Sequence, residues 1–267
     1  MHIEILGTVS VTVGGHEREI RSNKVRAMFA TLALEPGQPI SHVELADELW
    51  SGQPLGNVHN ALQAHAARLR KILESPSRGR AAGTVLRTVY NGYVLDIPRE
   101  SVDGNRFLDL AARGSTSLRH DPYRAIELLE SGLRLWRGPA LLDAGDGLRC
   151  KAAAAMFDER RLTMWEDLVS ARLAIGDVRQ AAADLRSLVS QHPLHEHLCA
   201  QLMIALYRSG RQGEALTLYH RTRRRLDDDL GVQPGLLLQQ RYAEILAQDP
   251  ALTLSGITGS SSMGRIA

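Results

Sequence analysis

The chain has 267 residues, which is too long for one small hydrophobic core and fits two domains of common size. Hydrophobic residues make up 44% of it and charged residues 23%, an ordinary balance that argues against the disordered and fibrous classes. The formal net charge of +2 does not by itself indicate a nucleic-acid partner.

Apolar runs and cysteines narrow the class further. No run approaches the roughly 18 apolar residues of a membrane span, and the start lacks a basic segment followed by an apolar one. We therefore expect a cytoplasmic protein with no membrane partner. The two cysteines, Cys150 and Cys199, lie far apart in helical patterns, so neither a disulfide framework nor a zinc site has the necessary spacing. Both are expected to be buried thiols.

The first predicted element is a small antiparallel sheet. Apolar residues alternate with mostly polar neighbours between Ile3 and Val13, which is the two-residue period of a strand. Gly14-Gly15 then turns the chain into a short third strand around residues 17–20.

Two helices follow the sheet. The first, about fourteen residues long, begins after the capping residue Ser22 and ends at Pro36-Gly37. Ser41 and Glu44 have the spacing of a capping box, which predicts the start of a second, shorter helix. Trp50 near the end of that helix is interpreted as a core residue.

A third helix is predicted over residues 57–74, and it is the candidate DNA recognition helix. Its buried stripe at helical spacing consists of Leu62, Ala66, Leu69 and Leu73. At about 100° per residue, the opposite face consists of Asn60, Gln63, Ala64, Ala67, Arg68 and Lys71, with His65 and Arg70 on the flanks. Alanines permit close approach to a groove wall, while Asn, Gln and Arg side chains suit base edges.

A β-hairpin is predicted after the third helix. Residues 85–88 and 93–97 have strand patterns, and Tyr90-Asn91-Gly92 supplies the turn between them. The order of sheet, three helices and hairpin is that of a winged helix-turn-helix. Arg87 and Asn91 of this wing are candidate DNA contacts.

Positive charge gathers between the third helix and the wing. From Arg68 to Arg87 there are six basic residues against one acid. A duplex carries one phosphate charge per about 1.7 Å of its axis, so this local cluster matters more for DNA binding than the net charge of the whole chain.

Arg68 is expected to contact a base or a phosphate, with a solvated surface arginine as the alternative. Arg70 and Lys71 are expected to hold phosphates, because half to two-thirds of protein–DNA hydrogen bonds go to the backbone. His65 either meets a phosphate or packs, half-buried, on the first helix.

Several motifs resemble a known family. Residues 1–97 resemble the winged-helix domain of OmpR/PhoB-type regulators in Leu69-Arg70-Lys71, Thr88-Val89 and Gly92-Tyr93. The whole chain resembles the Streptomyces antibiotic regulatory protein family, in motifs that include Glu48-Leu49-Trp50, Asn60-Ala61-Leu62-Gln63, Arg68-Leu69-Arg70 and Val102-Asp103 with Phe107. Trp136-Arg137-Gly138-Pro139-Ala140-Leu141 resembles the opening of the bacterial transcriptional activation domain that such proteins carry.

The resemblance implies a function and further site residues. It implies an activator that binds direct repeats at promoters, self-associates there, and recruits RNA polymerase holoenzyme through sigma factor and other subunits for a secondary-metabolite cluster. Thr88 is placed where a wing residue meets the DNA backbone, and Tyr90 where many relatives have a basic residue for the minor groove, which is a departure. The resemblance also implies polymerase contacts by Gln53, Pro54 and Leu55, for which a plain connector is the alternative.

The remaining chain predicts helical repeats. From about residue 105 to residue 247 only helical patterns occur. A shift of 34 residues aligns Leu168 with Leu202, Ala171 with Ala205, Gly176 with Gly210 and Ala181 with Ala215, which is the tetratricopeptide period. Such stacks present concave surfaces to peptides or partner helices. The arginines of residues 221–225 and the aspartates of 227–229 are either a docking patch or a solvated helix face.

The predicted fold class is therefore an α+β winged helix-turn-helix over residues 1–99, an all-α tetratricopeptide-like domain over 100–250 and a flexible tail over 251–267. The chain has no phosphate loop, HExxH, paired-cysteine or GxSxG motif, so we predict no enzyme and no cofactor. The histidines at 192, 195 and 197 straddle a proline at a helix start, where capping is favoured over metal binding.

Two alternatives to a DNA-binding activator remain at this point. One is a protein-interaction scaffold whose winged helix serves as a docking module without DNA binding, which Tyr90 in the wing and the low net charge leave open. The other is a ligand-sensing regulator, although the chain has no receiver, ATPase or phosphothreonine-binding segment. The double-stranded promoter remains the preferred partner, in a protein associated with the nucleoid.

Overall fold

The structure is a computed structural model that describes residues 1–50, 57–74 and 84–252. Contacts within it gather in two compact units. Residues 1–113 and 128–164 form the first unit, and residues 114–127 with the chain from Trp165 onward form the second. The domain boundary near residue 100 stays a prediction. The contacts show in addition that residues 100–113 and 128–164 pack against residues 1–99.

The first sheet is antiparallel, as predicted. It consists of β1 (His2–Glu4), β2 (Ser10–Val13) and β3 (His16–Arg18) in that order. Ile3 lies opposite Val11, and both side chains are fully buried, so the alternating pattern marks the inward face of the sheet.

The second sheet contains a strand that the sequence pattern did not predict. The predicted hairpin is β5 (Leu86–Val89) with β6 (Gly92–Leu95), and β4 (Pro39–Ser41) pairs antiparallel with β6 on its other side. Ser41 of β4 lies opposite Gly92, where a Cβ would overlap the carbonyl oxygen of Ile40. Glycine at this position therefore permits β4 to join the wing.

Three helices complete the winged helix: α1 (Asn23–Leu34), α2 (His42–Trp50) and α3 (Val58–Leu73). The predicted capping box is present, because the Ser41 hydroxyl and N–H donate to Glu44 Oε2 at 2.7 and 2.9 Å. Ser22 is the N-cap residue of α1, but its side chain makes no capping hydrogen bond. The four predicted core residues of α3, Leu62 to Leu73, are all buried.

The chain after residue 98 is helical, as predicted. Its elements are η1 (Arg99–Ser101), α4 (Asp103–Ser117), α5 (Pro122–Leu133), α6 (Leu148–Ala174), α7 (Val178–Gln191), α8 (Glu196–Arg208), α9 (Gln212–Leu230), α10 (Leu236–Leu246) and η2 (Pro250–Leu252). Among the described residues, none of these helices is long and apolar enough to cross a membrane.

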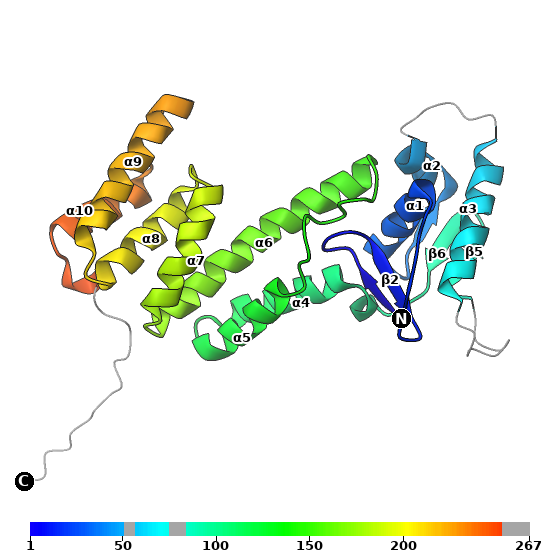
Figure 1. The fold of residues 1–267 in the computed structure, drawn as a ribbon, viewed down its shortest axis with the longest axis horizontal. Helices are drawn as coiled ribbons and strands as arrows, with labels where there is room; N and C mark the ends of the chain where they lie inside the picture. The colour runs from blue at the N-terminus through cyan, green and yellow to red at the C-terminus, as the bar shows by residue number, and fades with distance from the viewer. Residues whose placement is uncertain (51–56, 75–83, 253–267) are drawn as a thin grey trace, which may run out of the picture. The chain divides into compact units, whose positions relative to one another are not determined.

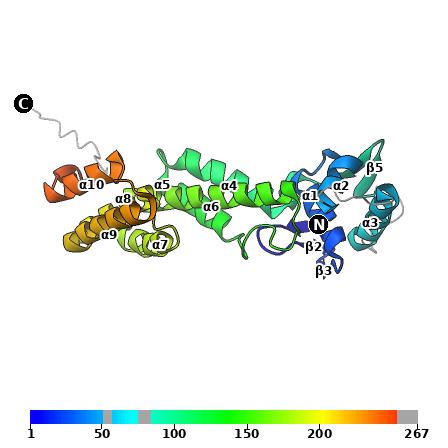
Figure 2. The same cartoon turned by 90° about the horizontal axis from the view of Figure 1, so that it is seen from above.

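Within the second unit, α8 packs against α7, α9 and α10, and Figures 1 and 2 show α7, α8 and α9 side by side. The glycines at equivalent positions of the predicted repeat, Gly176 and Gly210, both have positive φ, 81° and 75°. They make equivalent turns after α6 and after α8, a backbone shape that glycine adopts without strain. The matched Ala181 and Ala215 are fully buried, so the repeat pattern describes real helix pairs.

The cysteines and the histidine group behave as ordinary structural residues. Cys150 and Cys199 are free and buried, and burial raises the pKa of the Cys150 thiol to about 12. His195 is the N-cap of α8, where its Nδ1 accepts the Leu198 N–H at 3.5 Å. The part of the chain that the structure describes holds no cluster of three metal-ligating side chains.

Two buried carboxylates connect elements of the first unit that are distant in sequence. Asp103, at the start of α4, accepts the N–H groups of Ile5 and Leu6 at 2.7 and 3.2 Å. Burial raises the pKa of Asp103, and these N–H donors counter part of that rise. Glu48, on α2, accepts the N–H groups of Arg149 and Cys150 at 2.8 Å each. These N–H groups belong to the first turn of α6, where a helix has no internal partners for them and where its dipole favours a negative charge.

The segment before α6 pairs with the end of the first strand region. The Arg137 N–H donates to the Leu6 carbonyl and the Leu141 N–H to the Ile5 carbonyl, both at 2.8 Å. Trp136 lies under the guanidinium of Arg161, which is 4.4 Å from the ring centroid. The tryptophan motif of residues 136–141 thus has a structural role, since it fastens the α5–α6 connection to the winged helix.

We predict that Gly147→Ala destabilises the first unit. A Cβ at Gly147 would overlap the Glu48 carboxyl group and displace it from the first turn of α6. The expected loss in the free energy of unfolding is about 1–3 kcal/mol, as for other overpacked sites. Circular dichroism during urea unfolding would measure it.

The matched control is Gly213→Ala, because a Cβ built at Gly213 meets nothing within 4 Å. It should change the free energy of unfolding by no more than about 0.5 kcal/mol. Equal stability of the two variants would contradict the role assigned to the Glu48 cap.

Candidate nucleic-acid interface

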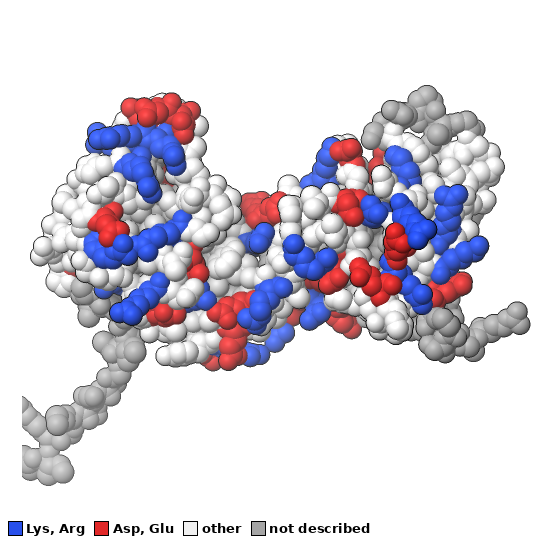
Figure 3. Space-filling model, viewed as in Figure 1, with Lys and Arg blue, Asp and Glu red and all other residues white. Residues whose placement is uncertain are grey.

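The outer face of α3 is exposed over its whole length. The exposed side chains include every residue predicted for that face: Asn60, Gln63, Ala64, Ala67, Arg68 and Lys71. In Figure 3, Lys and Arg side chains lie over α3. The helix is fixed from beneath by its buried leucines and at its start by Asn57, whose side chain accepts the Asn60 N–H at 3.0 Å. The face is therefore presented on a rigid element.

His59 is a neighbour of this face that the sequence pattern did not single out. Its Nε2 lies 2.8 Å from Nε2 of Gln63, one helical turn later. Its ring also packs edge-on against His42, with centroids 4.9 Å apart, and His42 in turn contacts Tyr93 of the wing at 5.3 Å. The spacing of four residues places His59 and Gln63 on the same side of a helix, and this spacing could have predicted their contact from the sequence. The contact restricts the orientation of the Gln63 amide, which is a candidate base-reading group.

Arg70, which the sequence predicts to hold a phosphate, donates hydrogen bonds within the winged helix. Its Nε donates to the Leu86 carbonyl at 3.0 Å, and its guanidinium donates to the Thr88 hydroxyl at 2.7 Å. The same guanidinium lies 5.9 Å from the ring centroid of Tyr93. Arg70 and Thr88 thus join the end of α3 to the wing, so the orientation of the wing depends on them.

His65 packs within the protein. It is half-buried and stacked on Trp50 of α2, with ring centroids 5.9 Å apart and planes 24° apart. Burial lowers its pKa, and the positive charges of Arg68 and Lys24 lower it further. The ring is therefore neutral at neutral pH, which favours the packing alternative, with α2 as its partner in place of the first helix.

The remaining wing residues are solvent-facing. Tyr90 is fully exposed at the tip of the hairpin, and Asn91 beside it is exposed. Arg87 forms an ion pair with Asp96 at 3.4 Å in which both side chains are more than half exposed. Screening by water makes such pairs weak, so Arg87 remains available to a phosphate.

The residues predicted to contact polymerase, Gln53, Pro54 and Leu55, lie outside the described residues, as do Arg78 and Arg80 of the basic cluster. Described cations near the outer face are therefore Arg68, Lys71 and Arg87. Of the other three basic residues of the sequence cluster, Arg78 and Arg80 are not described and Arg70 donates within the domain.

Two family models match the chain. The model described as the bacterial transcriptional activator domain matches residues 102–246. The model described as the C-terminal region of transcriptional regulatory proteins matches residues 17–95. Together they span most of the chain from the first sheet to α10.

Individual relatives agree with this assignment. The chain is 56% identical over 252 residues to the transcriptional regulator RedD of Streptomyces coelicolor, an alignment that covers 94% of this chain and 72% of that protein. It is 34% identical to the regulatory protein DnrI of Streptomyces peucetius, with 96% of both chains covered. The solved structure of Mycobacterium tuberculosis EmbR in complex with a low-affinity phosphopeptide superposes with a TM-score of 0.86 at 30% identity, over 94% of this chain and 68% of that one. The predicted fold, a winged helix followed by a helical domain, is confirmed.

We predict that Arg70→Ala lowers stability while Lys71→Ala does not. Removal of Arg70 leaves the Leu86 carbonyl and the Thr88 hydroxyl without their donor, at an expected cost of about 1 kcal/mol in the free energy of unfolding. Lys71 is exposed, so its removal should stay within about 0.5 kcal/mol. Urea unfolding of the two variants makes the comparison, and a stable Arg70→Ala variant would refute the tie between α3 and the wing.

Proposed function

The chain belongs to the Streptomyces antibiotic regulatory protein family of transcription activators, and from this premise we propose that it binds directly repeated promoter sites through α3. Two copies occupy the repeats, and the bound protein recruits RNA polymerase holoenzyme through sigma factor and other subunits. The target genes are those of a secondary-metabolite cluster, as the family resemblance implies. Such a protein acts in the cytoplasm at the nucleoid, where its DNA lies.

The observation that carries the proposal is the composition of the exposed face of α3. From Asn60 to Lys71 the helix rises by about 16 Å, a length that spans about five base pairs. Amide and guanidinium side chains pair with adenine and guanine edges in the major groove, and the two alanines let the helix approach the groove floor. A solvated helix of an interaction scaffold has no need for this combination.

The positions of the cations support a division into base contacts and phosphate contacts. Arg68 lies on the exposed face of α3 and is proposed to read a base, whereas Lys71 lies near the C-terminal end of α3 and Arg87 in the wing. We assign phosphate contacts to the latter two. Tyr90 projects from the hairpin tip, fully exposed, and can lie against the sugar–phosphate backbone without a charge.

Polymerase recruitment rests on the family resemblance. The segment that holds Gln53, Pro54 and Leu55 joins α2 to α3. These three residues lie outside the described residues, so the resemblance alone supports the proposed polymerase contact.

A salt titration tests DNA binding. The described cations Arg68, Lys71 and Arg87 together should contribute about −3 to the slope of the logarithm of half-site affinity against the logarithm of salt concentration. Lys71→Ala should lower the magnitude of that slope by about one. A gel shift or fluorescence anisotropy on promoter and random duplexes measures it, and a flat response in the wild-type protein would favour the docking-module alternative.

Arg68→Ala tests base recognition. If the guanidinium reads a base, the substitution should cost about 1–3 kcal/mol in promoter affinity and relax selectivity at one base position. Arg160→Ala, which removes an exposed arginine of α6 elsewhere in the first unit, is the matched control and should bind as the wild type does. Weaker binding with selectivity unchanged would reassign Arg68 to a phosphate.

A further inference from the structure

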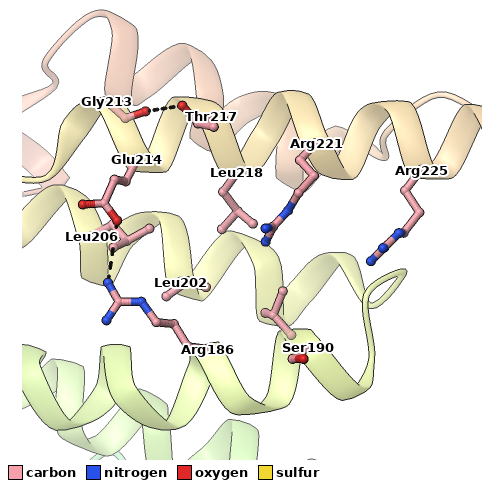
Figure 4. Close-up of a pocket in the computed structure, with 11 residues that line it drawn as sticks. Arg186, Ser190, Leu202, Leu206, Gly213, Glu214, Thr217, Leu218, Arg221 and Arg225 are labelled. Carbon is pink, nitrogen blue, oxygen red and sulfur yellow. Dashed lines mark hydrogen bonds and ion pairs between the residues drawn. The ribbon is translucent and has the colours of Figure 1, made fainter.

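A groove in the second unit has no role in the proposed DNA contacts. It lies between α7, α8 and α9, has a cavity volume of about 590 Å³, and is lined only by residues of the second unit (Figure 4). That volume falls within the range of about 300–1,000 Å³ that is usual for ligand clefts.

The groove has an apolar floor and a cationic rim. The floor consists of Val189, Leu202, Leu206 and Leu218, each nearly buried. Exposed arginines line the rim, namely Arg186 from α7 and Arg221 and Arg225 from α9. At one end, Gly213 presents bare backbone, and a Cβ built on it would meet nothing within 4 Å, so this end of the groove is open.

The charges of the rim are not balanced within the protein. Glu214 is the single acid of the lining and is already paired, with Arg211 at 2.5 Å and with Arg186 at 3.8 Å. Neither Arg221 nor Arg225 has an ion pair within the described ranges. The two are four residues apart on one face of α9, so their side chains begin about 5–6 Å apart.

We propose that this groove binds a short acidic peptide segment of a partner protein. In an extended peptide, alternate residues lie about 6.6 Å apart on the same side, which matches the spacing of Arg221 and Arg225. Carboxylates at alternate positions reach these two arginines, and arginine can bind each carboxylate through two parallel hydrogen bonds. The intervening apolar side chains face Leu202, Leu206 and Leu218.

A peptide fits this surface better than a nucleic acid does. Beside Arg225 lies a neighbouring depression in which Asp228 and Asp229 stand among the arginines 221, 224 and 225, and Glu214 stands at the opposite end of the groove. These carboxylates repel a phosphate backbone that would have to continue past both ends of the groove. A peptide can place its few charges on the arginines and end before the aspartates.

The experiment measures fluorescence anisotropy of a labelled decapeptide of alternating Leu and Asp with the full chain. Binding is expected for this peptide, and none for the matched peptides in which Asn or Lys replaces Asp. Reversal of two rim charges, Arg221→Glu with Arg225→Glu, should weaken binding by more than about tenfold, since it sets like charges against each other. Gly213→Phe, whose side chain enters the open end of the groove, should weaken it without any change of charge.

Arg223→Glu is the matched control, because Arg223 is exposed on the same helix and lines neither depression. It should retain peptide binding, and all variants should retain promoter binding, so failure of this proposal is distinguishable from failure of DNA recognition. Absence of peptide binding by the wild type, an equal loss in Arg223→Glu, or displacement of the peptide by a DNA duplex or by inorganic phosphate would each overturn the proposal. Circular dichroism melting confirms that each variant is folded.

Discussion

The carboxylate of Glu48 is the interaction on which the first unit depends. It occupies a buried position on α2 and accepts the N–H groups of Arg149 and Cys150 in the first turn of α6, where a helix offers no internal acceptors. Leu49 beside it enters the core, and Trp50 stacks on His65 of α3. Three consecutive residues therefore join the activation domain's long helix, the hydrophobic core and the recognition helix. The short helix α2 thus contacts both α6 and α3.

Other contacts make the same connection in parallel. Arg149 follows the Glu48 cap and binds Glu35 and Glu44, each at 2.6 Å. Asp103 holds the strand end at Ile5 and Leu6, while residues 137–142 pair with the carbonyls of the same strand end. The winged helix is thus built together with α4 and the start of α6, and family boundaries near residue 100 divide a single packed unit.

Patterns within a few residues were sufficient to predict most helices and strands of the winged helix, whereas the roles of single residues depend on contacts between distant parts of the sequence. The alternation from Ile3 to Val13, the capping box at Ser41 and the stripe of α3 depend on neighbours within a few residues, and each was confirmed. Strand β4 was missed because three residues carry too short a pattern and their pairing partner, β6, lies fifty residues away. The phosphate contact of Arg70 stays a prediction from its visible charge, whereas its hydrogen bonds to the Leu86 carbonyl and the Thr88 hydroxyl could not be predicted, because these groups become neighbours of Arg70 only on folding.

Phosphate contacts and base contacts contribute differently to the proposed recognition of a promoter. A phosphate contact raises the affinity for every sequence alike, whereas a base contact raises it for the promoter alone. Arg70 donates to the wing, and the half-buried ring of His65 stacks on Trp50, so among the described residues of α3 the exposed cations Arg68 and Lys71 are left for DNA. Under the proposed function, two copies on neighbouring repeats would add affinity through a high effective concentration, without further contacts by either copy.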